Sequence, residues 1–437
     1  MKRFWQIVKD LIKNRLVADS LVVLGGGMVA NLINYLYHLS MGRMLGPGDY
    51  GVMASLISVI YLGGIPLSVL SLVMVKYIST FRGKKQMLMV NFFYRWIIKK
   101  VIYFGVIGLI VFLFFVPLMA RFLHLNSYQL LIIVGLTSFL SLFPTVTSAM
   151  LQGFLRFNWN TLVGLATALT KLILAIIFVC LGLKIPGALL AILLSTGIGY
   201  LISIFFVREL TKSKFSTNAM KIDFDGSGVL SFALPTFLSI SAFTSLYTTD
   251  VILARHFLSA REAGFYAALA TLGKIVFFAS SPVITVMFPM VSERHALGGG
   301  YLTLLKFSLM IVLLISAGVS FIYLFFPKLM ILALYGREYL SASPHLKFFA
   351  VFLSLYSLSF LLVNFYLSIR EVRVVVLPVI AAILQIVLII LFHQNLAQVV
   401  WISIITLGLL LLSLLLYSFV NYGKAQKTFA FSRRSCL

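Results

Sequence analysis

Long apolar stretches follow one another along the whole chain, separated by short polar or basic segments. Each stretch holds about 20 apolar residues, the length that an α-helix needs to cross the hydrocarbon core of a bilayer. The pattern therefore predicts an all-α polytopic membrane protein with about twelve transmembrane helices. The predicted spans are residues 20–42, 50–75, 101–120, 128–152, 161–182, 185–207, 229–254, 264–291, 302–326, 346–369, 373–392 and 397–420.

Polar residues interrupt the first span in a regular way. The polar residues are Asn31, Asn34, Tyr35 and His38. The last three lie three, four and seven positions after Asn31, so all four share one face of the predicted helix. Hydrocarbon cannot hydrogen-bond polar side chains, so this face is expected to point into the protein. We interpret it as the lining of a cavity, with helix packing as the alternative.

A turn rich in glycine and proline follows the first span at residues 43–51, and a counterpart follows the seventh span at 258–266. Both turns come after an apolar helix with a polar stripe, which favours duplication of one half of the chain. We predict an N-terminal six-helix bundle (1–208), a cytoplasmic linker (209–228) and a C-terminal six-helix bundle with a short basic tail (229–437). A shift of 213 positions pairs Leu45 with Leu258, Asp49 with Glu262, Gly51 with Gly264, and Ala54 with Ala267.

Composition excludes a soluble protein and explains the high charge. Hydrophobic residues make up 61% of the chain and charged residues 11%, whereas soluble domains carry about 25% charged residues. The net charge of +24 could suggest nucleic acid, but most Lys and Arg lie in short loops between apolar spans, where they set topology. Their bias, roughly three to one toward the side of the termini, predicts that both termini face the cytoplasm.

The segment Gln86–Lys100 mixes aromatic and basic residues ahead of the third span. Two interpretations fit this composition. The segment could lie along the lipid headgroups as a short amphipathic helix, or it could act only as a determinant of topology.

Lysines inside the predicted spans are the most informative departure from the apolar pattern. Lys171 lies near the centre of the fifth span, and Lys274 near the middle of the eighth. A lysine at this depth costs roughly 2.5–3.5 kcal/mol, so it normally faces a wet cavity or a partner. Both are candidates for substrate binding, with a bond to helix carbonyls as the alternative. Lys306 is a weaker candidate because it is close enough to an interface to snorkel.

The seventh span repeats the polar character of the first. Thr244, Thr248 and Asp250 are candidate cavity residues within it. Asp250 lies close to the outer end, where it could pair with Arg255, Lys274 or Arg43, and an ion pair is favoured there over a proton or cation site. Arg43 and Arg255 are weaker candidates for the cavity. The hydroxyls could instead bond to their own helix and serve packing only.

Residues for catalysis or metal binding are few. The acidic residues lie in loops or near span ends, and the histidines show no metal-ligand spacing. Gly25-Gly26-Gly27 opens an apolar helix, so it predicts close helix packing and no phosphate loop. A glycan polymerase or glycosyltransferase would usually display a large loop or an acidic cluster, and the sequence has neither. We expect a non-enzymatic protein without a cofactor or a metal.

Several segments together resemble the polysaccharide-synthesis flippases of the multidrug/oligosaccharidyl-lipid/polysaccharide exporter superfamily. The resemblance covers nearly the whole chain and rests on its turns and span ends. These read Leu45-Gly46-Pro47-Gly48-Asp49-Tyr50-Gly51, Glu262-Ala263-Gly264-Phe265-Tyr266, Leu151-Gln152-Gly153-Phe154-Leu155-Arg156 and Asn364-Phe365-Tyr366-Leu367-Ser368-Ile369-Arg370.

The resemblance implies two six-helix bundles related by a pseudo-twofold axis around a central cavity, with alternating access. It also implies a bacterial plasma-membrane flippase for undecaprenyl-pyrophosphate-linked oligosaccharides, with a polysaccharide polymerase and glycosyltransferases as possible partners. Lys171 and Lys274 would attract the phosphate head, and the polar stripe of the first span would contact sugars or the gate. A small-molecule extruder of the same superfamily is the alternative, and the sequence leaves open whether protons or sodium ions drive either transporter.

Overall fold

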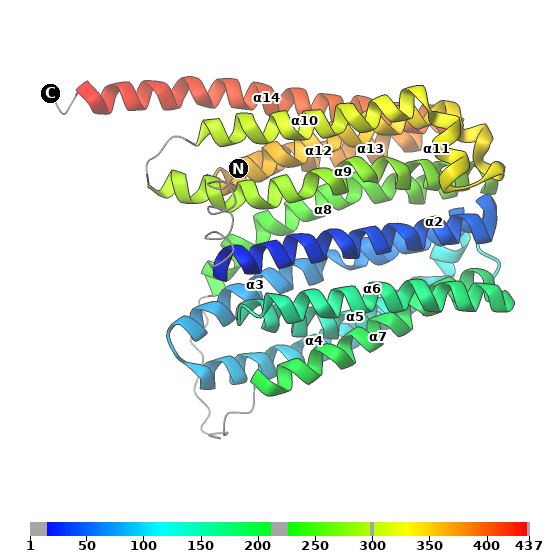
Figure 1. Ribbon diagram of the computed structural model, residues 1–437, viewed down its shortest axis with the longest axis horizontal. Coiled ribbons are helices and arrows are strands. Elements are labelled where there is room, and N and C mark those ends of the chain that lie inside the picture. The colour runs from blue at the N-terminus through cyan, green and yellow to red at the C-terminus, as the bar shows by residue number, and fades with distance from the viewer. Residues whose placement is uncertain (1–14, 211–225, 298–300, 435–437) are drawn as a thin grey trace, which may run out of the picture. The chain divides into compact units, whose positions relative to one another are not determined.

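The computed structural model describes residues 15–210, 226–297 and 301–434, and these ranges are almost entirely helical (Figure 1). Ten stretches within them are long and apolar enough to cross a membrane. Two of the ten, Gly25–Gly83 with 59 residues and Phe157–Leu210 with 54, are long enough for two crossings each. The described chain thus holds twelve spans, which confirms the predicted all-α membrane protein.

The chain divides into two compact units, Met1–Phe237 (unit 1) and Leu238–Leu437 (unit 2). The predicted linker 209–228 lies mostly outside the described residues, as do the basic N-terminal residues 1–14. Unit 1 contains α2 (Arg15–Gly63), α3 (Ile65–Gly83), α4 (Met87–Phe122), α5 (Gln129–Gly153), α6 (Phe157–Phe178), the π-helical turn η1 (Val179–Leu183) and α7 (Lys184–Leu210).

Unit 2 begins inside the next helix, at Leu238. Its elements are α8 (Gly226–Phe257), α9 (Ala260–Ala296), α10 (Leu302–Phe325), α11 (Pro327–Leu334), the 3₁₀ turn η2 (Arg337–His345), α12 (Leu346–Ser368), the 3₁₀ turn η3 (Val372–Val375), α13 (Val376–Leu391) and α14 (Leu396–Arg434).

The turn predicted after the first span breaks α2 into two arms. Gly46 has φ 72° and ψ 173°, a conformation that side chains with a Cβ rarely adopt, and Pro47 follows it. The arms then lie side by side, since the Tyr37 hydroxyl reaches the Met53 sulfur at 3.8 Å and the Tyr50 hydroxyl lies 3.4 Å from His38 Nδ1. The first two predicted spans are therefore the two arms of α2, the second continuing into α3.

The second long stretch turns back in the same way, between α6 and α7. Gly182 has φ 85° within η1, and the two helices then pack against each other. Glycines also let helices approach closely elsewhere in unit 1. A Cβ at Gly26 would lie 2.0 Å from Thr161 Cγ2, so α2 touches α6 here, as the glycine run predicted.

The segment 86–100 does not form a separate helix. It is the first part of α4, and its Phe93 and Ile97 are buried against Met74 and Ile78 of α3 and against α5. Apolar side chains on one face of the segment are thus buried against other helices of unit 1, and the position of the segment relative to the headgroups stays a prediction.

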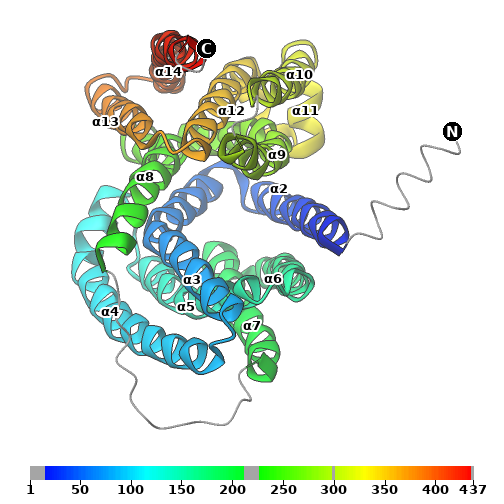
Figure 2. The ribbon, with the colours of Figure 1, turned by 90° about the vertical axis from the view of Figure 1, so that its left-hand side faces the viewer.

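Unit 2 is built around α12, which packs against α9, α10 and α14. Figure 2 looks along the helices and shows α12 beside α9 and α10. Aromatic rings fill the contact between α8, α9 and α12, where Tyr356 stacks edge-on against Phe243 and Phe277. This packing holds α8 and α9 in fixed register, and those helices carry the buried charges of the unit.

Candidate functional site

Lys171 of unit 1 is held by two neutral partners on α2. Its ammonium donates a hydrogen bond to Asn34 Oδ1 and lies 4.6 Å from the centroid of the Tyr37 ring. The ring is fixed because the buried Tyr37 hydroxyl donates to the Ala188 carbonyl at 3.1 Å. No carboxylate among the described residues forms an ion pair with Lys171. No neighbouring carboxylate therefore offsets the charge of this half-buried ammonium.

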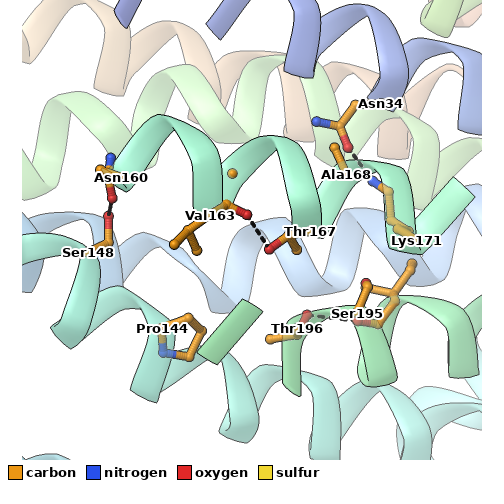
Figure 3. A pocket seen from close by; sticks show the side chains of 12 residues that line it. Asn34, Pro144, Ser148, Asn160, Val163, Thr167, Ala168, Lys171, Ser195 and Thr196 are labelled. Carbon is orange, nitrogen blue, oxygen red and sulfur yellow. Dashed lines mark hydrogen bonds between the residues drawn. The ribbon is translucent and has the colours of Figure 1, made fainter. Parts of the chain in front are cut away.

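Lys171 and Asn34 line a pocket of about 350 Å³ inside unit 1, between α2, α5, α6 and α7 (Figure 3). At the opposite end of the view, the Ser148 hydroxyl donates to Asn160 Oδ1 at 2.6 Å. Gln152 Nε2 in turn donates to Ser148 at 3.1 Å. The pocket thus has a charged end and a neutral polar end.

The sequence of α6 builds this pocket. Five of its residues share one helical face, because the last four lie four, seven, eight and eleven positions after the first. They are Asn160, Gly164, Thr167, Ala168 and Lys171. A Cβ at Gly164 would meet nothing within 4 Å, so the small residues leave the space open.

The pocket offers both hydrogen-bond acceptors and hydrogen-bond donors. The hydroxyls of Thr167 and Thr196 donate to carbonyls of their own helices, at 2.8 and 2.7 Å, which leaves their oxygens as acceptors. Asn34 and Asn160 each use the amide oxygen as an acceptor, so both amide NH₂ groups remain as donors. With the Lys171 ammonium, these groups suit a ligand rich in oxygen and negative charge.

Lys274 of unit 2 has a different neighbourhood. Its ammonium lies 4.9 Å from the centroid of the Tyr247 ring, and it interacts electrostatically with Asp250. The Asp250 carboxylate is 1% exposed and accepts hydrogen bonds from the Tyr266 hydroxyl at 2.8 Å and from the Val251 amide at 2.9 Å. The carboxylate is thus held in place and offsets the charge of the lysine.

The 213-residue shift relates the two neighbourhoods. It pairs Asn34 with Tyr247 and Tyr37 with Asp250, so each lysine contacts the same two positions of the repeat. The lysines themselves do not correspond, because Lys171 lies on α6, the fifth span, and Lys274 on α9, the eighth. The paired positions therefore lie on α2 and α8, and the cation comes from a different helix in each unit.

A further polar group is buried in unit 2 near Asp250. Gln385 of α13 donates to Ser403 of α14 at 2.8 Å and to the Leu246 carbonyl of α8 at 3.3 Å. Ser403 donates to the Val399 carbonyl at 3.1 Å. These side chains satisfy one another and tie three helices together.

The sequence model of the family described as polysaccharide biosynthesis protein matches residues 16–295, well over half of the chain. The chain belongs to this family.

Solved structures show the same fold in members of the MOP superfamily. A multidrug resistance MATE family transporter is similar in its inward-facing conformation (TM-score 0.72, 19% identity, 94% of this chain and 99% of that chain covered). Its outward-facing conformation gives a TM-score of 0.68 at 17% identity, with 94% of this chain and 96% of that chain covered. A MOP superfamily transporter from Pyrococcus furiosus, described as having a binding pocket of reverse polarity, gives a TM-score of 0.63 at 17% identity. The match covers 91% of this chain and 95% of that chain. No curated protein matches the sequence.

This member of the polysaccharide biosynthesis protein family brings only some of its predicted site residues together. From the polar stripe of the first span, Asn34 lines the pocket with Lys171, but Asn31, Tyr35 and His38 do not. Asn31 is exposed, and His38 lies beside Tyr50 at the fold of α2. The role of these residues in binding stays a prediction.

The remaining candidates are spread over the two units. Thr248 donates to the Thr244 carbonyl at 2.5 Å within α8, which is the packing arrangement that the sequence left as an alternative. Arg255 is buried near the end of α8, whereas Arg43 and Lys306 are exposed. Within the part of the chain that the structure describes, no group of three His, Cys, Asp or Glu residues could hold a metal ion.

Sequence reasoning missed most of the polar residues around the two lysines. The stripe on α6 could have been found, because Asn160, Thr167 and Lys171 share a face at helical spacing. Tyr266 belongs to the turn motif after the seventh span, but nothing in the motif indicates that its hydroxyl binds Asp250. Tyr37 could have been included in the polar stripe, since it lies three positions after Asn34 and next to His38.

Proposed function

We propose that this membrane protein transports an anionic lipid-linked oligosaccharide, of the undecaprenyl-pyrophosphate type, across a bacterial plasma membrane by alternating access. Both termini would face the cytoplasm, and no bond would be made or broken. The observation that carries the proposal is Lys171: a cation at membrane depth, held by an amide and a ring, in a pocket of oxygen-binding groups.

A lipid pyrophosphate fits this pocket chemically. Its negative charge is concentrated, and hydrocarbon alone would not solvate it. An ammonium with neutral partners can take the place of water around such a group. The amides of Asn34 and Asn160 would then bind phosphate or sugar oxygens next to it. Lys274 is less suited to the phosphate, because Asp250 already offsets its charge.

The family description supports a glycan substrate, since it concerns polysaccharide biosynthesis. A polysaccharide polymerase and glycosyltransferases are the partners that such a substrate implies. The similar transporter from Pyrococcus furiosus, with its pocket of reverse polarity, supports the idea that one scaffold carries pockets of opposite charge.

A cation-coupled extruder of small molecules is the second candidate. It is favoured by the fold shared with multidrug resistance MATE transporters and by the buried carboxylate of Asp250. An extruder of cationic compounds would use that carboxylate, and Lys171 would repel its substrate.

Headgroup translocation in proteoliposomes tests the proposal. Purified wild-type protein and the Lys171→Gln variant would be reconstituted with a fluorescent undecaprenyl-pyrophosphate oligosaccharide, and arrival in the opposite leaflet measured by enzymatic access. We expect Lys171→Gln to lower the rate by about tenfold or more, as loss of a charge-assisted hydrogen bond implies.

Lys328→Gln is the matched control, because it removes the same charge from an exposed position. Undiminished translocation by Lys171→Gln would refute the role of Lys171. Transport of a cationic dye by the wild type, together with no glycan translocation, would favour the extruder.

A further inference from the structure

A second pocket lies at one end of unit 1, apart from the Lys171 pocket. It has a volume of about 180 Å³ and is formed where α5 ends, α6 begins and α7 ends. Its lining consists of Leu151, Arg156, Trp159, Phe206, Glu209 and Leu210. The membrane-length stretches also end here, at Gly153, Phe157 and Leu210, so the pocket lies at the level of the membrane surface.

The pocket has two charged groups of opposite sign. Arg156 and Glu209 are both exposed, and neither forms an ion pair with a described residue. Arg156 is placed by the turn between α5 and α6, where its amide donates to the Leu151 carbonyl at 2.8 Å. A guanidinium and a carboxylate that line one pocket without pairing offer separate sites for an anion and a cation.

Two aromatic rings line the pocket together with these charges. The rings of Trp159 and Phe206 lie 3.9 Å apart between centroids, and Trp159 is 38% exposed. Tryptophan is favoured at this depth, where one part of the ring meets hydrocarbon and another meets headgroups. The volume has room for about six water molecules, which suits a headgroup and is too small for a glycan repeat.

From this arrangement we infer that the pocket binds a zwitterionic phospholipid with a primary ammonium, phosphatidylethanolamine. The phosphate would lie on Arg156 and the ammonium on Glu209, with the glycerol end of the chains against Trp159 and Phe206. A primary ammonium is favoured over a quaternary one because a carboxylate can accept its hydrogen bonds. The inference is independent of the transported substrate.

Native mass spectrometry of the purified, delipidated full chain tests it. The protein would be titrated with dioleoyl-phosphatidylethanolamine, and separately with the phosphatidylcholine and phosphatidylglycerol of the same chains. We expect one saturable site that prefers phosphatidylethanolamine. Glu209→Gln should weaken that lipid about fivefold to tenfold and leave phosphatidylglycerol binding unchanged or stronger. Arg156→Gln should weaken both lipids, because both carry the phosphate.

The matched controls are Glu293→Gln and Arg294→Gln, which remove the same charges from exposed positions in the last turn of α9. We expect both to bind like the wild type. Retained phosphatidylglycerol binding shows that the Glu209→Gln variant is folded. A preference for phosphatidylethanolamine that survives Glu209→Gln would overturn the inference, as would equal binding of all three lipids. Displacement of the lipid by an equal concentration of phosphoethanolamine would also overturn it, because the site would then recognise a soluble ligand.

Discussion

Lys171 in unit 1 and Lys274 in unit 2 each place an ammonium over a tyrosine ring, at 4.6 and 4.9 Å from the centroid. Their other neighbours differ. Lys171 donates to the neutral amide of Asn34, whereas Lys274 interacts with the buried carboxylate of Asp250. The first cation can therefore attract an anion, and the second is largely offset from within the protein.

The comparison shows that positions related by the 213-residue shift hold side chains of different charge in the two units. Positions 34 and 247 correspond in the repeat, as do 37 and 250, and in each unit one of the pair is a tyrosine. The tyrosine is at the second of the two positions in unit 1 (Tyr37) and at the first in unit 2 (Tyr247). The lysine that contacts the pair lies on α6 in unit 1 and on α9 in unit 2.

The largest effect should follow from breaking the pair in unit 2. Asp250→Ala leaves Lys274 without its buried counter-charge, so we expect the free energy of unfolding in detergent to fall by about 3–5 kcal/mol. Chemical denaturation followed by far-UV circular dichroism measures it. Adding Lys274→Met to Asp250→Ala should recover much of the loss, because both charges are then gone. Additive losses in the double variant would show that the two residues are not coupled.

The next prediction compares the two tyrosine hydroxyls. Tyr266→Phe removes a hydrogen bond to a carboxylate and should cost about 1.5–3 kcal/mol. Tyr37→Phe removes one to the Ala188 carbonyl and should cost about 1 kcal/mol. The same denaturation assay compares the variants, and Tyr103→Phe at an exposed ring is the control. Equal losses for Tyr37→Phe and Tyr266→Phe would mean that the charge of Asp250 adds nothing to the bond.

The fold was predictable from the sequence because membrane length and apolar content outweigh local detail. The first three spans show where such reasoning succeeds and where it ends. The break at Gly46 follows from a visible Gly-Pro pair, and the two arms were predicted as separate spans. By contrast, the segment 86–100 is polar enough to suggest a surface helix, and the sequence does not indicate that it continues into α4 and packs against α3.

The site was predictable only in part, for a similar reason. Lys171 and Lys274 look alike in the sequence, since each is a lone lysine inside an apolar span. They differ in their partners. Lys171 binds Asn34, which lies 137 positions earlier in the chain, whereas Lys274 interacts with Asp250 on the neighbouring helix. Such pairings depend on which helix faces lie together, and the apolar pattern does not fix those faces.

A third prediction compares the two turns, where the repeat pairs Gly46 with Ser259. Gly46→Ala forces a Cβ onto a backbone with φ 72° and ψ 173°, at a cost of about 1–3 kcal/mol. Ser259→Ala removes the N-cap of α9, whose side chain accepts from the Glu262 amide at 3.3 Å, and should cost about 1 kcal/mol. Melting temperatures measured in detergent rank the variants by stability. Gly48→Ala, where a Cβ would meet nothing within 4 Å, is the control.

The smallest change in stability should come from Lys171→Met. A methionine has a similar length and needs no counter-charge, and replacing a buried charge by an apolar side chain is often neutral or stabilising. The lost bond to Asn34 and the lost contact with the Tyr37 ring, about 0.5–1 kcal/mol, oppose this gain. We therefore expect unfolding free energies within about 1 kcal/mol of the wild type, measured as for Asp250→Ala. Lys274→Met should be clearly less stable, because it leaves the Asp250 carboxylate buried without a cation. If Lys171→Met is as destabilised as Lys274→Met, both lysines are structural and the charge of the unit 1 pocket is not reserved for a ligand.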